Sequence, residues 1–282
     1  MRRDTPSDSP PLAAAPGADA PLIYDLGMHK GEDAEFYLKK GFRVVAVEAN
    51  PELCALAAAR LLPHVESGRL TILNLAVAEA PGSRPFYRSE RTEWGTLRPE
   101  WAAIKSKRGA RFEEIAVEAV PLDEIVRAHG EPYFLKIDIE GMDVAALRSL
   151  SGTGFRPSYV SLESSVPVEE QIGLLGEMGY DRFKIVQQRW VKFQRPPRPA
   201  REGRFVRHRF AGGASGLFGE EAPGRWLTAE QALRRYRRIF LGHRLYGDPP
   251  VFGGRPARRL LDLLRIHPGW HDTHARHSSV ER

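Results

Sequence analysis

The sequence has almost no cysteine and no long hydrophobic run. Cys54 is the single cysteine among 282 residues, so the chain can form no internal disulfide, and we expect a reducing, cytoplasmic location. No stretch of about 18 consecutive apolar residues occurs, and we therefore expect no membrane span. Cys54 itself lies in a stretch rich in alanine and leucine, and we expect it to be a small buried core residue.

The first 20 residues lack the apolar core of a secretory signal peptide. They are rich in proline, alanine and serine, and we expect them to form a flexible leader. Hydrophobic residues make up 42% of the chain and charged residues 28%, which is typical of a globular protein. We therefore expect a globular domain over residues 21–190 and a partly helical, basic extension over residues 191–282.

The net charge of +6 is divided unevenly along the chain. From Arg182 onward there are 22 Lys and Arg against 8 Asp and Glu, whereas the first 181 residues carry 20 against 28. The basic C-terminal third could bind a phosphate, an anionic sugar, RNA or a membrane surface. Scattered surface arginines also serve solubility, and the charge balance alone leaves both interpretations open.

Short apolar runs alternate with helical patterns over the first 190 residues. Strands are expected at 22–27, 43–48, 70–77, 115–120, 133–139, 159–163 and 180–186. Because strands and helices alternate with tight joints, we predict an α/β protein with an about seven-stranded, mostly parallel sheet and helices on both faces. We expect this core to end near residue 190. Residues 80–112 show no clear period, and they form either a lid over the site or a mere connection.

The first candidate site follows the first strand, in the spacing Asp25-x-Gly27-x-x-x-Gly31. The two glycines let the backbone pass close to a ligand. The helix that begins beyond Gly31 offers free N–H groups to an anionic group such as a carboxylate. Glu48 ends the second strand, where a carboxylate can accept hydrogen bonds from the hydroxyls of a ribose. Asn74, in the third strand, could reach an adenine edge or cap a turn.

The second candidate site is the segment 135–141, LKIDIEG, in which two carboxylates close an apolar strand. Ligands of open parallel sheets bind at the carboxyl ends of the strands. Asp138 and Glu140 alternate, so we expect them to point to the same side unless the turn at Gly141 rotates one of them. They could deprotonate a hydroxyl, orient a sulfonium or hold a cation, and a helix N-cap around Glu140 is the structural alternative. Glu163 ends the neighbouring strand and could join the same cleft.

The first candidate site, the second strand with Glu48 and the segment LKIDIEG follow one another in an order that resembles the FkbM-type family of S-adenosylmethionine-dependent methyltransferases. The resemblance covers about residues 22–187, and LKIDIEG is its most specific part. It is carried by YDLGMHKGED (24–33), VVAVEANP (44–51), LNLAV (73–77), VPLDEI (120–125), FLKIDIEGMDVAAL (134–147) and VSLESS (160–165). One departure is Met28-His29-Lys30 between the two glycines, where many relatives have small or apolar residues.

The resemblance implies a Rossmann-like class I methyltransferase fold whose last strand is antiparallel. It implies S-adenosylmethionine as cofactor and methyl transfer to a hydroxyl of a small-molecule or glycan acceptor, such as a sugar, a lipid-linked compound or a secondary metabolite. Glu48 would hold the ribose, and Asp138 and Glu140 would face the methyl group as catalytic residues. The remaining cofactor-binding positions would be Asp25, Gly27, Met28, His29, Gly31, Asn74 and Ala76. His29 is either solvent-facing or a base that touches substrate.

Two features of the C-terminal third have their own interpretations. His271 and His274 have a spacing that could hold zinc on a helix, but no cysteine pair supports such a site, and we expect no metal. Residues 212–226 are rich in glycine, and we expect them to fold back on the catalytic domain and help form the acceptor pocket. Helices are expected from Thr228, which forms a capping box with Gln231, and over residues 257–266.

Three other functions compete with the leading hypothesis. A methyltransferase that acts on RNA or another polyanion would use the basic third, but the sequence lacks aromatics interleaved along a basic stripe, which argues against nucleic acid. A non-catalytic module that kept the fold is the second alternative. A nicotinamide-dependent dehydrogenase ranks last, because Glu32 and Asp33 follow Gly31 where the pyrophosphate fingerprint requires its third glycine.

Overall fold

The computed structural model of the chain describes residues 20–164, 167–246 and 270–280. The expected leader, apart from its last residue, and the helix expected over residues 257–266 lie outside these ranges. Within the described ranges, no helix combines the length and the apolar composition that crossing a membrane requires.

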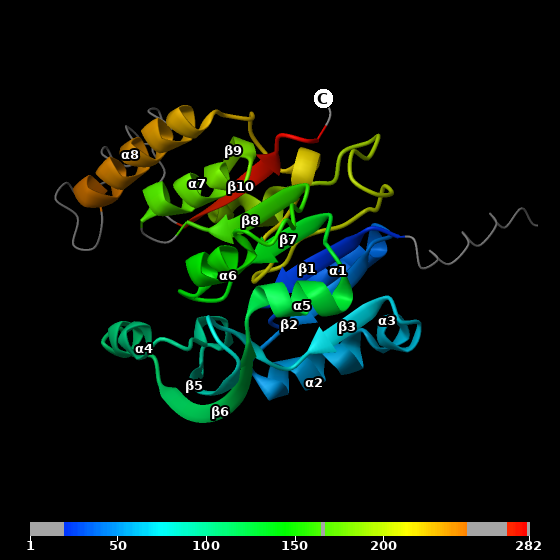
Figure 1. Cartoon of the computed structure of the whole chain (residues 1–282), viewed down its shortest axis with the longest axis vertical. Coiled ribbons are helices and arrows are strands. Elements are labelled where there is room, and N and C mark those ends of the chain that lie inside the picture. The colour runs from blue at the N-terminus through cyan, green and yellow to red at the C-terminus, as the bar shows by residue number, and fades with distance from the viewer. Residues whose placement is uncertain (1–19, 165–166, 247–269, 281–282) are drawn as a thin grey trace, which may run out of the picture.

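The main sheet has seven strands in the order β3-β2-β1-β7-β8-β10-β9 (Figure 1). All of them run in the same direction except β10, which is antiparallel to both of its neighbours. The predicted α/β fold, with a mostly parallel sheet and one antiparallel strand, is therefore confirmed. The strands are β1 (Leu22–Leu26), β2 (Arg43–Val47), β3 (Leu70–Leu73), β7 (Phe134–Ile137), β8 (Tyr159–Glu163), β9 (Tyr180–Gln187) and β10 (His271–His277).

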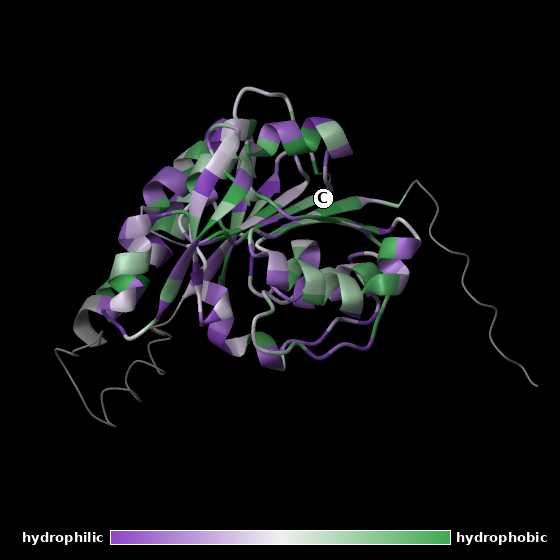
Figure 2. Cartoon of the chain, turned by 90° about the horizontal axis from the view of Figure 1, so that it is seen from below, coloured by the Kyte–Doolittle hydropathy of each residue, from purple (hydrophilic) through white to green (hydrophobic). Residues whose placement is uncertain are grey.

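Helices cover both faces of this sheet, because successive strand side chains point to opposite faces. Leu22, Tyr24 and Leu26 of β1 join one buried cluster, whereas Ile23 joins the other. The first cluster is covered by α5 (Leu122–His129), α6 (Asp143–Leu150), α7 (Val168–Glu177) and α8 (Ala229–Tyr246). The second is covered by α1 (Glu32–Lys39), α2 (Pro51–Arg60), α3 (Leu62–Glu66) and the segment from η2 (Gln188–Phe193) to η3 (Gly219–Glu221). Figure 2 shows hydrophobic residues on the sheet and on the helix faces that meet it.

The irregular stretch at 80–112 is an ordered module. A second sheet has the order β4-β6-β5 and consists of β4 (Ala76–Val77), β5 (Gly82–Ser89) and β6 (Phe112–Val120). Between β5 and β6 lie η1 (Thr92–Trp94) and α4 (Pro99–Ser106). The strand expected at 115–120 therefore exists as part of β6, but outside the main sheet. The strand expected at 70–77 is divided into β3 and β4.

The expectation that the sheet core ends near residue 190 is wrong, because β10 lies between β8 and β9. The predicted number of seven strands is correct, although β6 has left the set and β10 has joined it. That residues 191–246 form an extension separate from the catalytic domain stays a prediction. Residues 271–277, expected in the same extension, belong to the main sheet.

β10 is polar in sequence, and two of its polar side chains find partners on distant elements. The hydroxyls of Thr273 and Tyr236 on α8 lie 2.7 Å apart, and Arg276 forms a 3.0 Å ion pair with Glu220. His274 is buried, neither of its ring nitrogens has a hydrogen-bond partner among the described residues, and burial lowers its pKa to about 3. Because the segment is a strand, His271 and His274 point to opposite faces, and the helical zinc spacing does not apply.

The segment after β9 is fastened to α1 and to the sheet. Lys40, just after α1, forms a 3.0 Å ion pair with Glu221, and neither side chain is exposed. Oε1 of Glu221 also accepts the backbone N–H of Arg201 and of Glu202. Phe218 stacks on Phe134 of β7 with ring centroids 4.8 Å apart. These contacts fix the segment that leads to residues 211–215, which border the cavity described next.

Candidate active site

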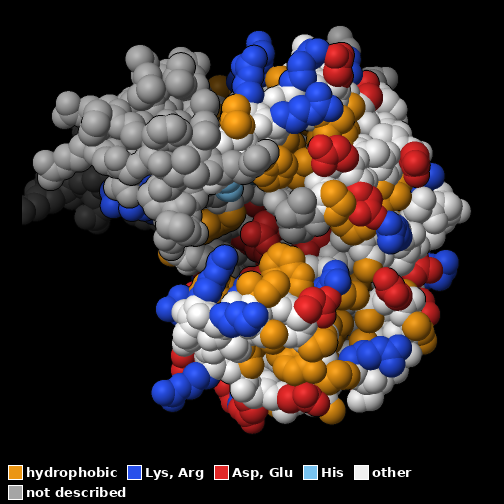
Figure 3. Space-filling view, turned by 90° about the vertical axis from the view of Figure 1, so that its left-hand side faces the viewer, with side chains coloured by type: hydrophobic (Ala, Val, Ile, Leu, Met, Phe, Trp, Pro, Cys, Tyr) orange, Lys and Arg blue, Asp and Glu red, His pale blue; other side chains and the backbone are white. Residues whose placement is uncertain are grey.

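A cavity of about 900 Å³ lies at the edge of the main sheet where β1, β2, β7 and β8 end. Its volume falls in the range of roughly 300–1,000 Å³ that is typical of ligand sites. Figure 3 shows a hollow with acidic side chains in its depth and Lys and Arg around its rim. Of the ten predicted site residues, six line this cavity: Gly27, His29, Glu48, Ala76, Asp138 and Glu140.

Gly27 lies where the loop after β1 passes the loop after β7. Its φ of +77° is in the left-handed region, and a Cβ atom at this position would lie 1.8 Å from the backbone oxygen of Asp138. Its N–H donates to the Val47 carbonyl oxygen at 2.9 Å, as does the N–H of Met28 at 3.0 Å. Any side chain at residue 27 would therefore push apart the three strand ends that form the floor of the cavity.

Glu48 lies directly after β2 and faces the cavity from a buried position. Oε1 accepts the N–H of Asn50 and Oε2 accepts the N–H of His29, both at 2.9 Å. Burial raises the pKa of Glu48, and these two backbone N–H groups oppose that shift. Each carboxylate oxygen can accept a further hydrogen bond besides the one from its backbone donor. The fold therefore holds this carboxylate in place and leaves it able to bind a ligand.

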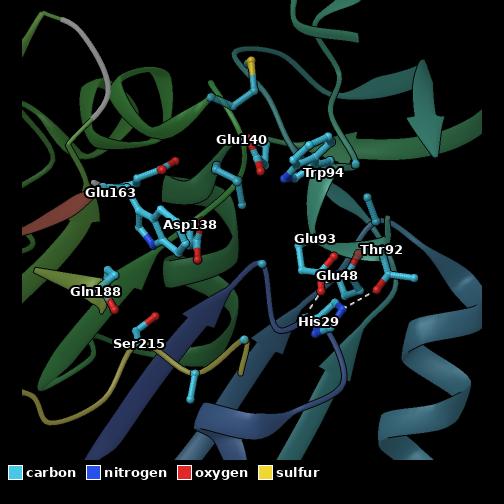
Figure 4. A pocket seen from close by; sticks show the side chains of 18 of the residues that line it. His29, Glu48, Thr92, Glu93, Trp94, Asp138, Glu140, Glu163, Gln188 and Ser215 are labelled. Atoms are coloured by element: carbon cyan, nitrogen blue, oxygen red, sulfur yellow. Dashed lines mark hydrogen bonds between the residues drawn. The ribbon is translucent and has the colours of Figure 1, made fainter. Parts of the chain in front are cut away.

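His29 connects the first loop to the 80–112 module. Its φ is 55°, and its ring nitrogens lie 3.2 Å from Oε1 of Glu32 (Nδ1) and 2.7 Å from Oγ1 of Thr92 (Nε2). The side chain is 12% exposed and lines the cavity (Figure 4). The solvent-facing interpretation of His29 is therefore wrong. Both ring nitrogens are engaged by Glu32 and Thr92.

Asp25 lies behind the cavity wall rather than in it. It is fully buried, and its Oδ1 accepts a 2.9 Å hydrogen bond from Nζ of Lys136, its register partner on β7. The same Nζ lies 3.6 Å from Oδ2 of Asp33 and 4.0 Å from Oδ2 of Asp138. Burial raises the pKa of Asp25, and Lys136 opposes the shift. One lysine thus connects the two sequence motifs at their base.

The two predicted catalytic carboxylates have different surroundings. β7 ends at Ile137, and Glu140 has a φ of 48°, so the alternation expected from a continuous strand does not hold. Figure 4 shows both side chains at the cavity but well apart. Oε2 of Glu140 accepts a 2.5 Å hydrogen bond from Nζ of Lys105 on α4. The side chain of Asp138 is 45% exposed, and its Oδ2 lies 4.0 Å from Nζ of Lys136.

Glu163 and Asp272 add two acidic groups to the same cavity. They are opposite each other in the β8–β10 ladder, so their side chains share one face. Burial, followed by repulsion from Asp138 and Glu140, raises the pKa of Glu163 to about 8. Burial and repulsion from Asp138 and Glu163 also raise the pKa of Asp272, which accepts a hydrogen bond from Nε2 of Gln188.

Two segments far apart in sequence form opposite walls of the cavity. The 80–112 module supplies Phe86, the residues 92–95, Leu97, Trp101, Lys105 and Arg108, and the C-terminal segment supplies the residues 211–215. The N–H of Ser215 donates to both carboxylate oxygens of Asp33, at 3.0 and 2.9 Å. The 80–112 module forms a wall of the site, which is consistent with its interpretation as a lid. The glycine-rich loop folds back on the catalytic domain at the cavity, which is consistent with the expectation for residues 212–226.

Three of the remaining predicted site residues lie outside the cavity wall. Met28 is buried in the core beneath the first loop, and Gly31, with a φ of +81°, precedes α1, where an added Cβ atom would lie 3.0 Å from Cδ1 of Leu61. Asn74 donates from Nδ2 to the carbonyl oxygens of Glu48 and Ala49, at 3.0 and 3.1 Å. These three residues do not line the cavity, whereas Ala76 does.

Sequence reasoning gave no role to Lys136, Asp33, Lys105 or Asp272. A signal was present for Lys136, because a lysine inside an otherwise apolar strand needs a buried counter-charge. No comparable signal marks Asp272, which lies in a polar segment more than 100 residues after the second motif.

The comparison with protein families agrees with this geometry. The family model of the methyltransferase FkbM domain matches residues 25–185, from Asp25 of the first motif to Ile185 of β9. The chain belongs to the FkbM methyltransferase family. It is therefore a methyltransferase that uses S-adenosylmethionine, in a Rossmann-like fold.

Several solved methyltransferase structures are distantly similar to this chain. A methyltransferase from Archaeoglobus fulgidus described as SAM-dependent has 10% identity and a TM-score of 0.38, over 92% of this chain and 86% of that one. Precorrin-6y C5,15-methyltransferase from Geobacter metallireducens has 15% identity and a TM-score of 0.32, over 60% and 68%. The SAH-bound methyltransferase PaMTH1 from Podospora anserina has 10% identity and a TM-score of 0.30, over 50% and 44%.

Proposed function

We propose that this protein methylates a hydroxyl oxygen of a small-molecule or glycan acceptor. The observation that carries the proposal is the position of Asp138, an accessible carboxylate at the end of β7 inside the cavity. A hydroxyl loses a proton when its oxygen is methylated, and a carboxylate within hydrogen-bond reach can take it. Glu140 is engaged by Lys105, so we assign the proton-accepting role to Asp138 and a positioning role to Glu140.

The residues at the β1–β2 end of the cavity fit the cofactor. The Glu48 carboxylate, held by two backbone N–H groups, has the acceptor capacity that ribose hydroxyls require. Gly27 keeps the floor of the cavity free of a side chain, and Ala76 does so nearly as well. When bound, the cofactor supplies a methyl group on a positively charged sulfur. We propose that Asn74 acts indirectly, because its amide donates to the backbone that follows Glu48.

The acidic depth of the cavity suits this reaction. The acceptor oxygen forms a bond to the methyl carbon as the carbon–sulfur bond breaks, and the hydroxyl proton passes to a carboxylate. The accessible Asp138 carboxylate would favour a positively charged sulfur before transfer. Close, in-line approach should contribute more to the rate than the strength of the base, so the walls formed by the 80–112 module and residues 211–215 matter as much as the carboxylates.

Cofactor binding is tested by calorimetric titration of the purified protein with S-adenosylhomocysteine, with NADH as the control ligand. We expect micromolar binding to the intact protein and none to NADH. Glu48→Ala and Glu48→Gln should weaken binding by about tenfold or more, because hydrogen bonds to a charged group are lost. Glu52, an exposed glutamate on α2, provides the matched control. Glu52→Ala should bind S-adenosylhomocysteine normally. No binding by the intact protein would overturn the proposed site.

The proton-accepting role is tested by Asp138→Asn, once an acceptor is known. We expect turnover to fall by about 10²-fold or more, the usual contribution of a general base, with affinity for S-adenosylhomocysteine changed little. Glu140→Gln should lower turnover less. If Asp138→Asn keeps full turnover, the carboxylate does not accept the proton.

A further inference from the structure

The rim of the cavity carries three cations that no carboxylate of the described residues neutralises. Arg108 follows α4, and Arg189 and Lys192 lie in η2, on the opposite wall; all three are exposed and line the cavity. Among the residues that the structure describes, none of the three forms an ion pair with a carboxylate. Lys105, deeper in the same wall, is by contrast paired with Glu140.

The geometry of η2 directs two of these cations to the same side. A 3₁₀ helix has three residues per turn, so residues at i and i+3 lie above one another. Arg189 and Lys192 are such a pair, and both line the cavity. Trp190 and Phe193 form the next pair, with ring centroids 5.7 Å apart on an exposed face. Val191 is buried. The helix therefore presents one cationic face to the cavity.

The depth of the cavity is rich in acidic residues, whereas its rim carries basic ones. The depth holds Glu48, Asp138, Glu140, Glu163 and Asp272, and the rim holds the three unpaired cations. A positively charged sulfur is suited to the depth, whereas like charges gathered at the rim repel one another until an anion lies between them. Arginine suits phosphate and carboxylate in particular, because its planar fork donates two parallel hydrogen bonds.

Aromatic rings line the same cavity. Trp94 and Trp101 line the cavity, and Nζ of Lys105 lies 5.2 Å from the Trp94 ring centroid and 5.6 Å from that of Trp101. Their faces offer apolar surface to the ring of an acceptor. From these contacts, and on the basis of the proposed function, we propose that the acceptor is an anionic hydroxy compound. Its phosphate or carboxylate is held by Arg108, Arg189 and Lys192 while a hydroxyl lies near Asp138.

The test is a calorimetric titration of the full chain, saturated with S-adenosylhomocysteine, at low salt. The probes are glucose 1-phosphate, glucuronic acid and neutral methyl glucoside, so that phosphate and carboxylate are compared with an uncharged ring. We expect at least one anionic probe to bind about tenfold or more tightly than methyl glucoside. This preference should shrink as salt is raised, because the cations are exposed.

Two variants assign the preference to the rim. The triple variant R108Q/R189Q/K192Q should lose it, whereas the matched triple variant R84Q/R207Q/R237Q, at three exposed arginines outside the cavity wall, should keep it. Equal binding of anionic and neutral probes, no binding of either anionic probe, or retention of the preference in the rim variant would overturn the inference. Titration with S-adenosylhomocysteine alone separates this outcome from failure of the proposed function, since the rim variant should bind that ligand normally.

Discussion

Nζ of Lys136 on β7 donates to Oδ1 of Asp25 on β1 at 2.9 Å, across a parallel ladder in which the two residues are register partners. Asp25 is two residues before Gly27, and Lys136 is two residues before Asp138. The pair therefore joins the loop assigned to the cofactor with the loop assigned to proton transfer. Asp33 on α1 is part of the same group, since it lies 3.6 Å from Lys136 and accepts the N–H of Ser215.

Replacement of Lys136 by methionine should destabilise the fold strongly. The change leaves Asp25 and Asp33 buried without their cation, and removal of one partner from a buried ion pair costs about 3–5 kcal/mol. The free energy of unfolding in urea, measured at pH 7.5, checks this. Lys39→Met is the control, because its ion pair with Glu35 is exposed and should contribute about 1 kcal/mol at most. Equal losses in both variants would show that the buried lysine has no special role.

Replacement of Gly27 by alanine should abolish binding of S-adenosylhomocysteine. The new Cβ atom would lie 1.8 Å from the backbone oxygen of Asp138, so the loops on the cavity floor must separate. Gly68→Ala is the matched control: its φ of +68° is similar, but nothing lies within 4 Å of the added atom. The control should cost only the left-handed strain, about 1–2 kcal/mol, and should bind the ligand normally. Normal binding by the Gly27 variant would contradict the prediction.

Glu163 should make stability fall as the pH rises. Its pKa in the folded protein is raised from 4.5 to about 8, so between these values the folded state holds a proton that the unfolded state has released. Stability is then lost with rising pH, by at most about 1.4 kcal/mol per unit. Urea unfolding of the wild type and of Glu163→Gln at pH 5, 6.5 and 8 checks the sign. The variant should become the more stable of the two at pH 8.

The exposed Glu177 on α7 provides the control for the pH prediction. Glu177→Gln removes the same charge outside the cavity, and it should follow the pH dependence of the wild type. Parallel stability curves for wild type and Glu163→Gln would mean that Glu163 is not held protonated by its surroundings.

The strands β1, β2 and β7 and the glycine and acidic residues at their ends could be predicted because the signals there are local. Glycine positions, apolar strands and the residues that end those strands placed Gly27, Glu48 and Asp138 correctly at one edge of a parallel sheet. The expectation for Glu140 was less accurate, because β7 ends at Ile137 and the chain turns before Glu140. No local pattern specified this end, since the residues beyond it meet distant parts of the chain, Asp138 near Gly27 and Glu140 at Lys105.

The parts that sequence could not predict depend on distant partners. Residues 271–277 look like a histidine-rich polar segment, and they become a buried strand because Thr273, Asp272 and Arg276 meet Tyr236, Gln188 and Glu220. β5 contains Pro85 and two arginines, and its partner β6 supplies the ladder that makes it a strand. Such pairings are tertiary information, which residue propensities do not contain.

The position of β10 has a consequence for how the protein is made. β8 and β9 each carry an open edge until residues 271–277 pair with both of them, so the sheet stays incomplete while the first 270 residues emerge from the ribosome. Asp272 enters the cavity in the same step. Completion of the sheet and completion of the site are therefore one late, long-range event, and such events slow folding. A nascent chain stopped before this point would expose two strand edges to its neighbours, the arrangement from which sheet proteins aggregate.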